Sequence, residues 1–461
     1  MAEQHHDIGE EQRNNVGPAT RDEQAHFLGY GPELDTRQAE ELAEEYHAAW
    51  LAALGLPVDE IAARMDVSRA TVYRLLKSAE KDHGLLDTRP RVALPVGEGA
   101  ELLWQRVERT DLGRQVKTRL DQRYGSDTAP REVLVAPTAS LTETEQGERR
   151  NIQVVRRVAR VGARRLMRGL LQEESPVRIC GINWGFHCWR LSHSLPGELF
   201  ARLSMERARD LRFFPLVGSI GLIDEDREHY IADTSANSNA ERCVENLSRY
   251  GLEPGAHAQR DTESPIPPAI ELTQPCVIPF PVDNRDHGTY LEQVWRYIAS
   301  DVSVQAVFGE EWALAQLHGT DMPAHDPAHG PLLHRADTLI TGLSTVRDSR
   351  AVRIGAIAEQ LAEQAREARA VGELSAHYFC EAAEEPARRE ALRRVNRWVV
   401  APTISDYQQC TIRARQTGRG LGTVLLASFS RKTAAVDAAI SRGAANVLVC
   451  DEELAKSLLE L

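Results

Sequence analysis

The hydrophobic pattern becomes helical after a polar N-terminal stretch. In the first periodic segment, apolar residues recur every fourth position, at Leu42, Tyr46, Trp50 and Leu54. This spacing predicts a helix that buries one face and ends near Gly55. Two shorter helices are expected next, one with Ile61 and Met65 facing inward and one capped by Ser68. We therefore predict a polar, disordered arm over residues 1–34 and a three-helix domain over residues 35–90.

Strand and helix patterns alternate along the rest of the chain. Short apolar runs predict strands at residues 132–136, 177–181, 213–217, 276–281, 338–341, 423–427 and 446–449. Helices are predicted at residues 101–123, 152–171, 185–195, 238–250, 290–308, 432–442 and 452–459. Two stretches, 253–275 and 318–334, are rich in Pro, His, Asp and Gly and are interpreted as loops. Such alternation favours an α/β fold, with a parallel or mixed sheet covered by helices over residues 91–461.

Residues 56–84 have the pattern of a DNA-binding helix-turn-helix. Ala62, Val67 and Val72 are small or apolar where two helices would touch, and polar residues fill the first turns of the second helix. The candidate DNA contacts are Ser68, Arg69, Thr71, Tyr73, Arg74 and Lys77. Arg69 can address O6 and N7 of guanine, whereas Arg74 and Lys77 suit the phosphate backbone. The alternative is a solvated helical hairpin whose charge arose by chance.

The charge of the whole chain at first argues against DNA binding. The 461 residues carry a formal net charge of −13, which disfavours non-specific binding of nucleic acid over the whole surface. Residues Ser68 to Lys81, however, hold four basic residues and one acidic residue. The local charge of the second helix is therefore opposite to that of the chain, and a small local DNA-binding surface remains compatible with the composition.

Cysteine usage and hydropathy indicate the compartment. Seven cysteines are widely spaced and form no CxxC, which excludes a disulfide framework and most structural zinc sites and fits a reducing cytoplasm. No apolar run approaches the roughly 20 residues that span a bilayer. No secretory signal is visible either. We therefore expect a cytoplasmic protein without a membrane partner.

Four glycine-bearing motifs stand at predicted strand ends. They lie at Val177–Leu191 (VRICGINWGFHCWRL), Phe214–Gly221, Asp337–Ser349 and Ser430–Leu459, and shorter similarities occur at Gly372–Leu374, before Phe379, and at Asn396–Val400. Together with the helix-turn-helix, these motifs resemble the SorC family of bacterial sugar-binding transcriptional regulators over most of the chain. The resemblance implies a large, doubly wound α/β effector domain of the phosphosugar isomerase or coenzyme A transferase type. It also implies that a sugar or phosphorylated sugar binds at the carboxyl ends of the strands.

The same strand ends suit an anionic ligand on physical grounds. A strand followed by a glycine-rich turn and a helix N-terminus directs backbone N–H groups toward an anion. The candidate effector-binding residues are Asn183, Trp184, Gly185, Phe186, His187, Gly218, Ser219, Gly342, Ser344, Glu373 and Lys432. The resemblance gives Lys432 the role of pairing with phosphate, but His187 replaces the usual Thr or Ser, and Ser219 stands where Gly is common. Core packing of Trp184, a satisfied histidine at 187 and a solvated lysine at 432 are the alternatives.

These features together predict a transcriptional regulator of carbohydrate metabolism. A homodimer or tetramer would bind operator DNA, and an effector in the C-terminal domain would modulate that binding. No catalytic residue, metal ion or cofactor is expected, and the prolines within residues 318–334 favour a polar loop over a metal site for its four histidines. The alternative is an enzyme like the phosphosugar isomerases or transferases with a helical oligomerisation segment. Glu373 and Lys432 are its only catalytic candidates.

Overall fold

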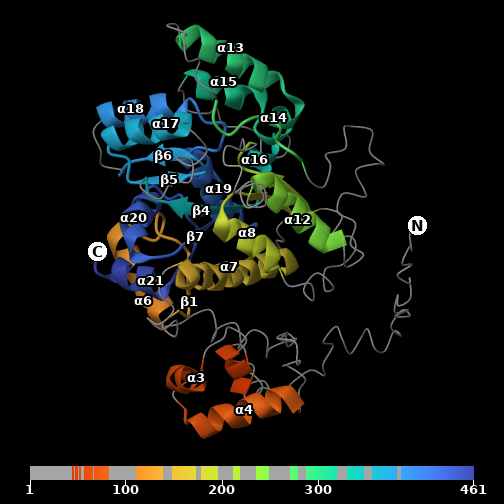
Figure 1. The fold of residues 1–461 in the computed structure, drawn as a ribbon, viewed down its shortest axis with the longest axis vertical. Coiled ribbons are helices and arrows are strands. Elements are labelled where there is room, and N and C mark those ends of the chain that lie inside the picture. The colour runs from red at the N-terminus through yellow and green to blue at the C-terminus, as the bar shows by residue number, and fades with distance from the viewer. Residues whose placement is uncertain are drawn as a thin grey trace, which may run out of the picture.

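The computed structural model describes two parts of the chain (Figure 1). The described residues are 44–45, 47–49, 51–52, 57–65, 67–81, 111–138, 148–172, 178–195, 211–218, 235–248, 270–278, 287–318, 330–346, 356–381 and 386–461. We call residues 44–81 the helical unit and residues 111–461 the α/β unit. The predicted arm over residues 1–34 and the predicted domain boundary near residue 90 lie outside the described residues.

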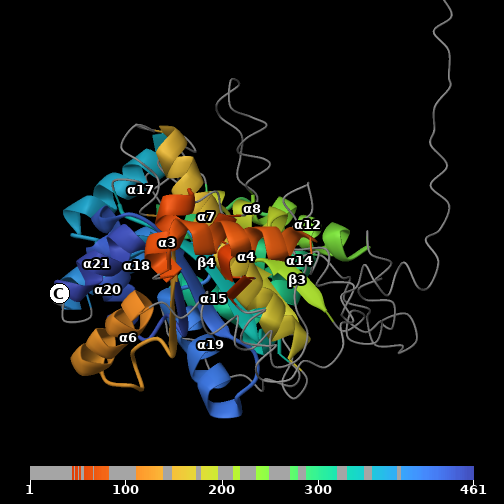
Figure 2. The same ribbon diagram turned by 90° about the horizontal axis from the view of Figure 1, so that it is seen from below.

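The helical unit contains the predicted helix-turn-helix. Helices α3 (Val58–Met65) and α4 (Arg69–Lys81) follow helical residues between 44 and 52, and Figure 2 shows α3 set crosswise to α4. The three segments share one buried apolar cluster, formed by Ala48, Ala49, Leu51, Ile61, Ala62, Val72, Leu75 and Ala79. Ser68 caps α4 as predicted, because its Oγ accepts a hydrogen bond from the backbone N of Thr71 at 3.1 Å. The predicted helix-turn-helix is therefore confirmed.

A parallel sheet of six strands forms the centre of the α/β unit. In spatial order the strands are β1 (Glu132–Ala136), β8 (Val447–Asp451), β7 (Gly422–Ala427), β4 (Thr338–Ser344), β2 (Ile179–Ile182) and β3 (Arg212–Pro215). The short antiparallel strands β5 (Gly372–Leu374) and β6 (His377–Phe379) extend from the carboxyl end of β4, where Leu343 pairs with Leu374. The strand predicted at 276–281 does not form a regular strand in its described part, where Val277 makes an isolated bridge to Val399, and residues 279–281 lie outside the described residues.

Helices cover both faces of this sheet, because its strands are apolar on both sides. Leu134 and Ala136 belong to the apolar cluster beneath α7 (Glu148–Leu171), α8 (Phe186–His193) and α12 (Ala236–Ser248). Val133 and Val135, which alternate with them, belong to the larger cluster on the opposite face. That face is covered by α6 (Asp111–Tyr124), α16 (Leu332–Arg335), α19 (Ile404–Thr417), α20 (Thr433–Ser441) and α21 (Glu452–Leu459). The predicted α/β fold with helices on both faces is confirmed; a phosphosugar isomerase type stays a prediction.

Further helices extend the larger cluster. They are α13 (His287–Ser300), α14 (Val302–Val307) and α15 (Glu310–His318), together with α17 (Ala356–Glu367) and α18 (Pro386–Asn396). The single helix predicted at 290–308 is broken at Asp301, whose side chain accepts hydrogen bonds from the backbone N atoms of Ser303 and Val304 and so begins α14. The loop predicted at 318–334 is partly wrong, because His318 ends α15 and α16 begins at Leu332. Residues 319–329 lie outside the described part.

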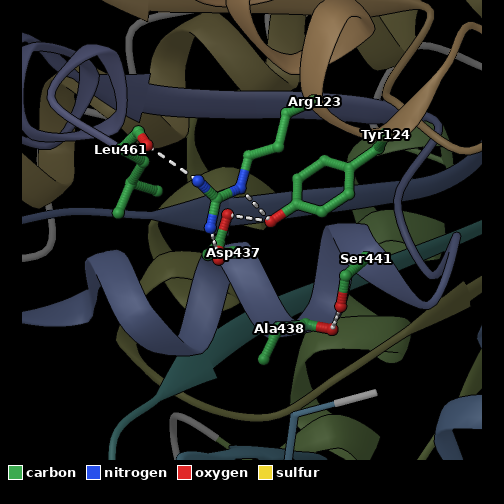
Figure 3. A network of polar contacts seen from close by, with 6 residues as sticks. All are labelled: Arg123, Tyr124, Asp437, Ala438, Ser441 and Leu461. Atoms are coloured by element: carbon green, nitrogen blue, oxygen red, sulfur yellow. Dashed lines mark hydrogen bonds and ion pairs between the residues drawn. The ribbon is translucent and has the colours of Figure 1, made fainter. Parts of the chain in front are cut away.

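The carboxyl end of α6 is fastened to α20 by a polar network (Figure 3). The hydroxyl of Tyr124 donates to Asp437, and Arg123 donates from Nε to that hydroxyl at 2.8 Å and from Nη2 to Asp437 at 3.3 Å. Arg123 also donates from Nη1 to the backbone oxygen of Leu461 at 2.7 Å. Partial burial and the bond to Asp437 raise the pKa of Tyr124 to about 12, so the hydroxyl remains a donor at neutral pH.

Candidate DNA interface and effector site

The exposed face of α4 carries most of the predicted DNA contacts. Val72, Leu75 and Ala79 are buried against the rest of the helical unit. Ser68, Arg69, Tyr73, Arg74 and Lys77 are exposed, whereas Thr71 is half-buried. Tyr73 is 58% exposed, which is unusual for a large aromatic side chain without a partner surface. The helix thus presents an arginine, a tyrosine and two further cations on one side.

The amino end of α4 has no acidic residue of its own, and its acidic neighbour is Asp59 of α3. No acidic residue lies in its first turn, so nothing within that turn offsets the positive end of the helix dipole. Arg69, the first helical residue, forms an ion pair with Asp59 of α3, with 2.6 Å between Nε and Oδ1. A helix end of this kind can accept a phosphate group, while exposed side chains beyond it reach the groove.

The effector candidates converge where three neighbouring strands end. Strands β2, β4 and β7 are adjacent and parallel, so their carboxyl ends lie at one edge of the sheet. The buried His187, after β2, shares a hydrogen bond of 2.8 Å between its Nε2 and the Oγ of Ser428, after β7. The buried Lys432 donates from Nζ to the backbone oxygen of Leu343 in β4. The structure therefore brings His187 and Lys432 to one edge, and it adds Ser428, which sequence reasoning missed.

The turn between β2 and α8 leaves space above its glycine. Gly185 has φ +95°, a backbone conformation that favours glycine, and a Cβ added there would meet no atom of the described residues within 4 Å. Phe186, the first residue of α8, stacks on Trp189 at 5.3 Å between ring centroids and packs against an apolar cluster that includes Phe429. The edge of the sheet therefore combines polar groups with an aromatic wall.

Two carboxylates hold the loop that follows β7. The backbone N of Phe429, a non-glycine residue with φ +78°, donates to Asp451 at 2.9 Å. Ser430 donates to Glu453 from its backbone N at 3.2 Å and from its hydroxyl. Burial raises the pKa of Asp451, whereas the hydrogen bonds from Ser430 lower the pKa of Glu453. Asp451 ends β8 directly after its apolar run and Glu453 lies in the first turn of α21, a sequence signal that would have placed both at this edge.

Other predicted effector residues have structural contacts. Asn183 donates to the hydroxyl of Thr341 at 2.7 Å and accepts from the backbone N of Trp184, which is itself buried in the larger apolar cluster. At Gly218, an added Cβ would lie 2.1 Å from the carbonyl oxygen of Gln274, so the glycine permits close backbone packing. Their contact with an effector stays a prediction, and Ser219 lies outside the described residues.

Glycine and acidic positions beside β4 complete the predicted set. Gly342 faces His187, and a Cβ added there would lie 3.8 Å from the Cβ of His187. Ser344 pairs with Glu373 in the β4–β5 register. The buried Glu373 accepts a hydrogen bond from the backbone N of Ala376 at 2.9 Å, which closes the turn between β5 and β6. Glu373 thus stands beside the site as a part of the hairpin.

Within the described part of the chain, no three His, Cys, Asp or Glu side chains are grouped so that they could hold a metal ion. No helix in that part has the length and apolar character needed to cross a bilayer. The seven cysteines are all buried free thiols, and burial raises the pKa of Cys180 and Cys188 among them.

The helical unit lies in a part of the chain that matches a known protein family. Residues 40–87 match the model of the homeodomain-like domain family. No curated protein matches the sequence. Among solved structures, a DeoR family transcriptional regulator from Listeria monocytogenes aligns at 15% identity and a TM-score of 0.47, over 75% of this chain and 99% of that chain.

Two further solved structures give similar values. The full-length sorbitol operon regulator SorC from Klebsiella pneumoniae aligns at 15% identity and a TM-score of 0.45, over 91% of this chain and 99% of that chain. A transcriptional regulator from Streptococcus pneumoniae aligns at 13% identity and a TM-score of 0.44, over 75% and 96%. Similarity at this level assigns no function by itself. The chain carries a homeodomain-like domain ahead of its α/β unit and is similar to transcriptional regulators of the SorC and DeoR types.

Proposed function

We propose that this protein is a DNA-binding transcriptional regulator whose operator affinity is modulated by a small effector. The observation that carries the proposal is the exposed face of α4 in the homeodomain-like domain, with Arg69, Tyr73, Arg74 and Lys77 on it. Arg69 would contact a base in the major groove, and Arg74 and Lys77 would contact phosphates.

The proposed effector is a sugar or a phosphorylated sugar. In open α/β sheets, ligands bind beyond the carboxyl ends of the strands, the edge at which His187 bonds to Ser428 and Lys432 bonds to Leu343. The ammonium group of Lys432 and the amino end of α8 would attract a phosphate, and the hydroxyl of Ser428 would suit sugar hydroxyls. The protein would act as a homodimer or tetramer. Its seven unpaired cysteines are consistent with action in the reducing cytoplasm.

Selection from a random duplex library by the full chain tests the DNA-binding role. We expect enrichment of one partly palindromic sequence at moderate salt. Lys77→Ala should then weaken binding of all duplexes about equally and lower the salt dependence of affinity, because one phosphate contact is lost. Arg69→Ala should instead relax preference at one base pair, at a cost of about 1–3 kcal/mol. Absence of any enriched sequence would refute the proposed function.

A thermal-shift panel of free and phosphorylated sugars tests the effector role. A ligand at about 100 times its Kd should stabilise the protein by about 2.7 kcal/mol. Lys432→Met should abolish the response to phosphorylated sugars, whereas Arg431→Met removes one charge from the adjacent, exposed residue and should leave it intact. Release of a chemically altered sugar from the same panel would favour the enzyme instead. No response to any member would count against the effector class.

A further inference from the structure

The ion pair between Asp59 and Arg69 links the two helices of the helix-turn-helix at its exposed surface. The 2.6 Å contact joins Oδ1 of Asp59, in the first turn of α3, to Nε of Arg69, the first residue of α4. The two side chains remain 65% and 64% exposed, so the pair lies on the surface rather than in the core. An exposed pair of this kind contributes little to folding stability. The geometry of the pair bears instead on how the guanidinium group of Arg69 is oriented.

The 2.6 Å contact is made at Nε, the nitrogen nearest the aliphatic part of the side chain. A contact at this nitrogen lets the two Nη groups, at the end of the fork, serve as donors to a base. Two parallel donors of this kind match O6 and N7 of guanine in the major groove. An unrestrained arginine would lose rotamer freedom when it forms the same two bonds, whereas a held arginine has lost part of it already.

We infer that Asp59 is a positioning residue for base recognition: it holds Arg69 so that its two Nη groups meet one guanine. The inference rests on the proposed DNA-binding function. It also assigns a second effect to Asp59, because its carboxylate would lie near the phosphate backbone and repel it. DNA that lacks the guanine therefore meets the repulsion without the compensating bidentate contact, and the discrimination between sites increases.

The test uses the full chain and the duplex that it enriches from a random library. Each base pair of that duplex is then replaced singly, and affinities are measured against a scrambled duplex of the same length. For Asp59→Asn we expect discrimination at one guanine position to fall about fivefold. The charge-matched control is Glu60→Gln, in the same turn of α3. Both variants should bind the scrambled duplex about twofold more tightly, but Glu60→Gln should keep the base preference.

Two Arg69 variants separate positioning from a general loss of structure. Arg69→Ala should abolish discrimination at the same position, and Asp59→Asn should add nothing in that background. Arg69→Lys keeps the charge but lacks the planar fork, so it should lose the preference while the salt dependence of affinity stays unchanged. The midpoint temperature of thermal unfolding of the full chain should change little in all of these variants.

Three outcomes would overturn the inference. Retention of full discrimination by Asp59→Asn would show that the carboxylate does not position Arg69. An equal rise of affinity for all duplexes would show that Asp59 only competes with DNA for the arginine. An additional loss in the Arg69→Ala background would show that Asp59 acts through another group. Each of these differs from the failure of the proposed function, in which the chain enriches no sequence at all.

Discussion

The buried imidazole of His377 predicts that acid weakens the α/β unit. His377 lies in β6 and is only 4% exposed. Burial lowers its pKa from the ordinary 6.5 to about 4, although a hydrogen bond with the backbone of Val399 acts in the opposite direction. Within the described residues its Nε2 has no hydrogen-bond partner. Protonation of this ring therefore costs more in the folded protein than in the unfolded chain.

The sign and size of the effect follow from the two pKa values. Because the folded pKa is the lower one, the contribution of neutral His377 is complete above pH 6.5 and is lost as the pH falls toward 4. Between pH 7 and pH 5, this linkage removes about 2 kcal/mol from the free energy of unfolding. That loss is a substantial part of the 5–15 kcal/mol typical of folded domains.

Urea unfolding followed by tryptophan fluorescence measures this loss, because Trp295, Trp312 and Trp398 are buried in the same large cluster. The variant His377→Asn keeps an amide N–H near the position of Nδ1 and removes the titrating ring. It should be less stable than the parent at pH 7 by about 1–3 kcal/mol, since ring contacts are lost. Its further loss between pH 7 and pH 5 should be smaller than that of the parent by about 2 kcal/mol.

The exposed His318 at the end of α15 provides the matched control. His318→Asn should change the free energy of unfolding at pH 7 by less than about 0.5 kcal/mol, because an exposed ring is removed. If His377→Asn loses as much stability between pH 7 and pH 5 as the parent, the buried ring does not titrate as argued and the reasoning is refuted.

Two further stability predictions concern close packing and the α6–α20 network. Gly218→Ala should cost about 3 kcal/mol or more, because the added Cβ would lie 2.1 Å from the carbonyl oxygen of Gln274, and calorimetry should show a lower Tm. Tyr124→Phe should lower the free energy of unfolding in urea by about 1–2 kcal/mol, because the carboxylate of Asp437 loses a donor. The control Tyr297→Phe, at an exposed tyrosine, should change it by less than about 0.5 kcal/mol. Because the pKa of Tyr124 is raised to about 12, the contribution of its hydroxyl to folding stability should persist up to pH 10 and be lost as the pH rises toward 12. Absorbance titration should show that one tyrosine ionises at a higher pH than the others.

Sequence patterns predicted the elements whose cause is local. The central strands β7 and β8 are continuous apolar runs because both faces of the sheet are covered, and such runs are visible without the structure. Ser68 precedes an amphipathic run and caps it, which is a relation within a few residues. The convergence of His187 and Lys432 was also predictable in outline, because both follow strands whose carboxyl ends share an edge.

The missed elements depend on contacts between distant residues. Strands β5 and β6 have three residues each, and their turn places Ser375 and Ala376 at positive φ without the glycine or asparagine that signals such a turn. The predicted strand at 276–281 contains Pro279 and Pro281, which lack the donor that a central strand needs. Ser428 became a candidate only when the sheet order placed it opposite His187.

The distribution of charge explains how an acidic chain would bind DNA selectively. A net charge of −13 repels DNA at long range, and the exposed face of α4 supplies only a few cations to oppose it. Because non-specific affinity grows with the number of phosphate contacts, one helical unit alone would hold arbitrary DNA weakly. In the proposed homodimer, base contacts by two copies on the halves of a palindromic site would supply the remaining free energy. Joint binding of two copies depends strongly on their spacing, and subunit spacing is the property that an effector in the α/β unit would have to change.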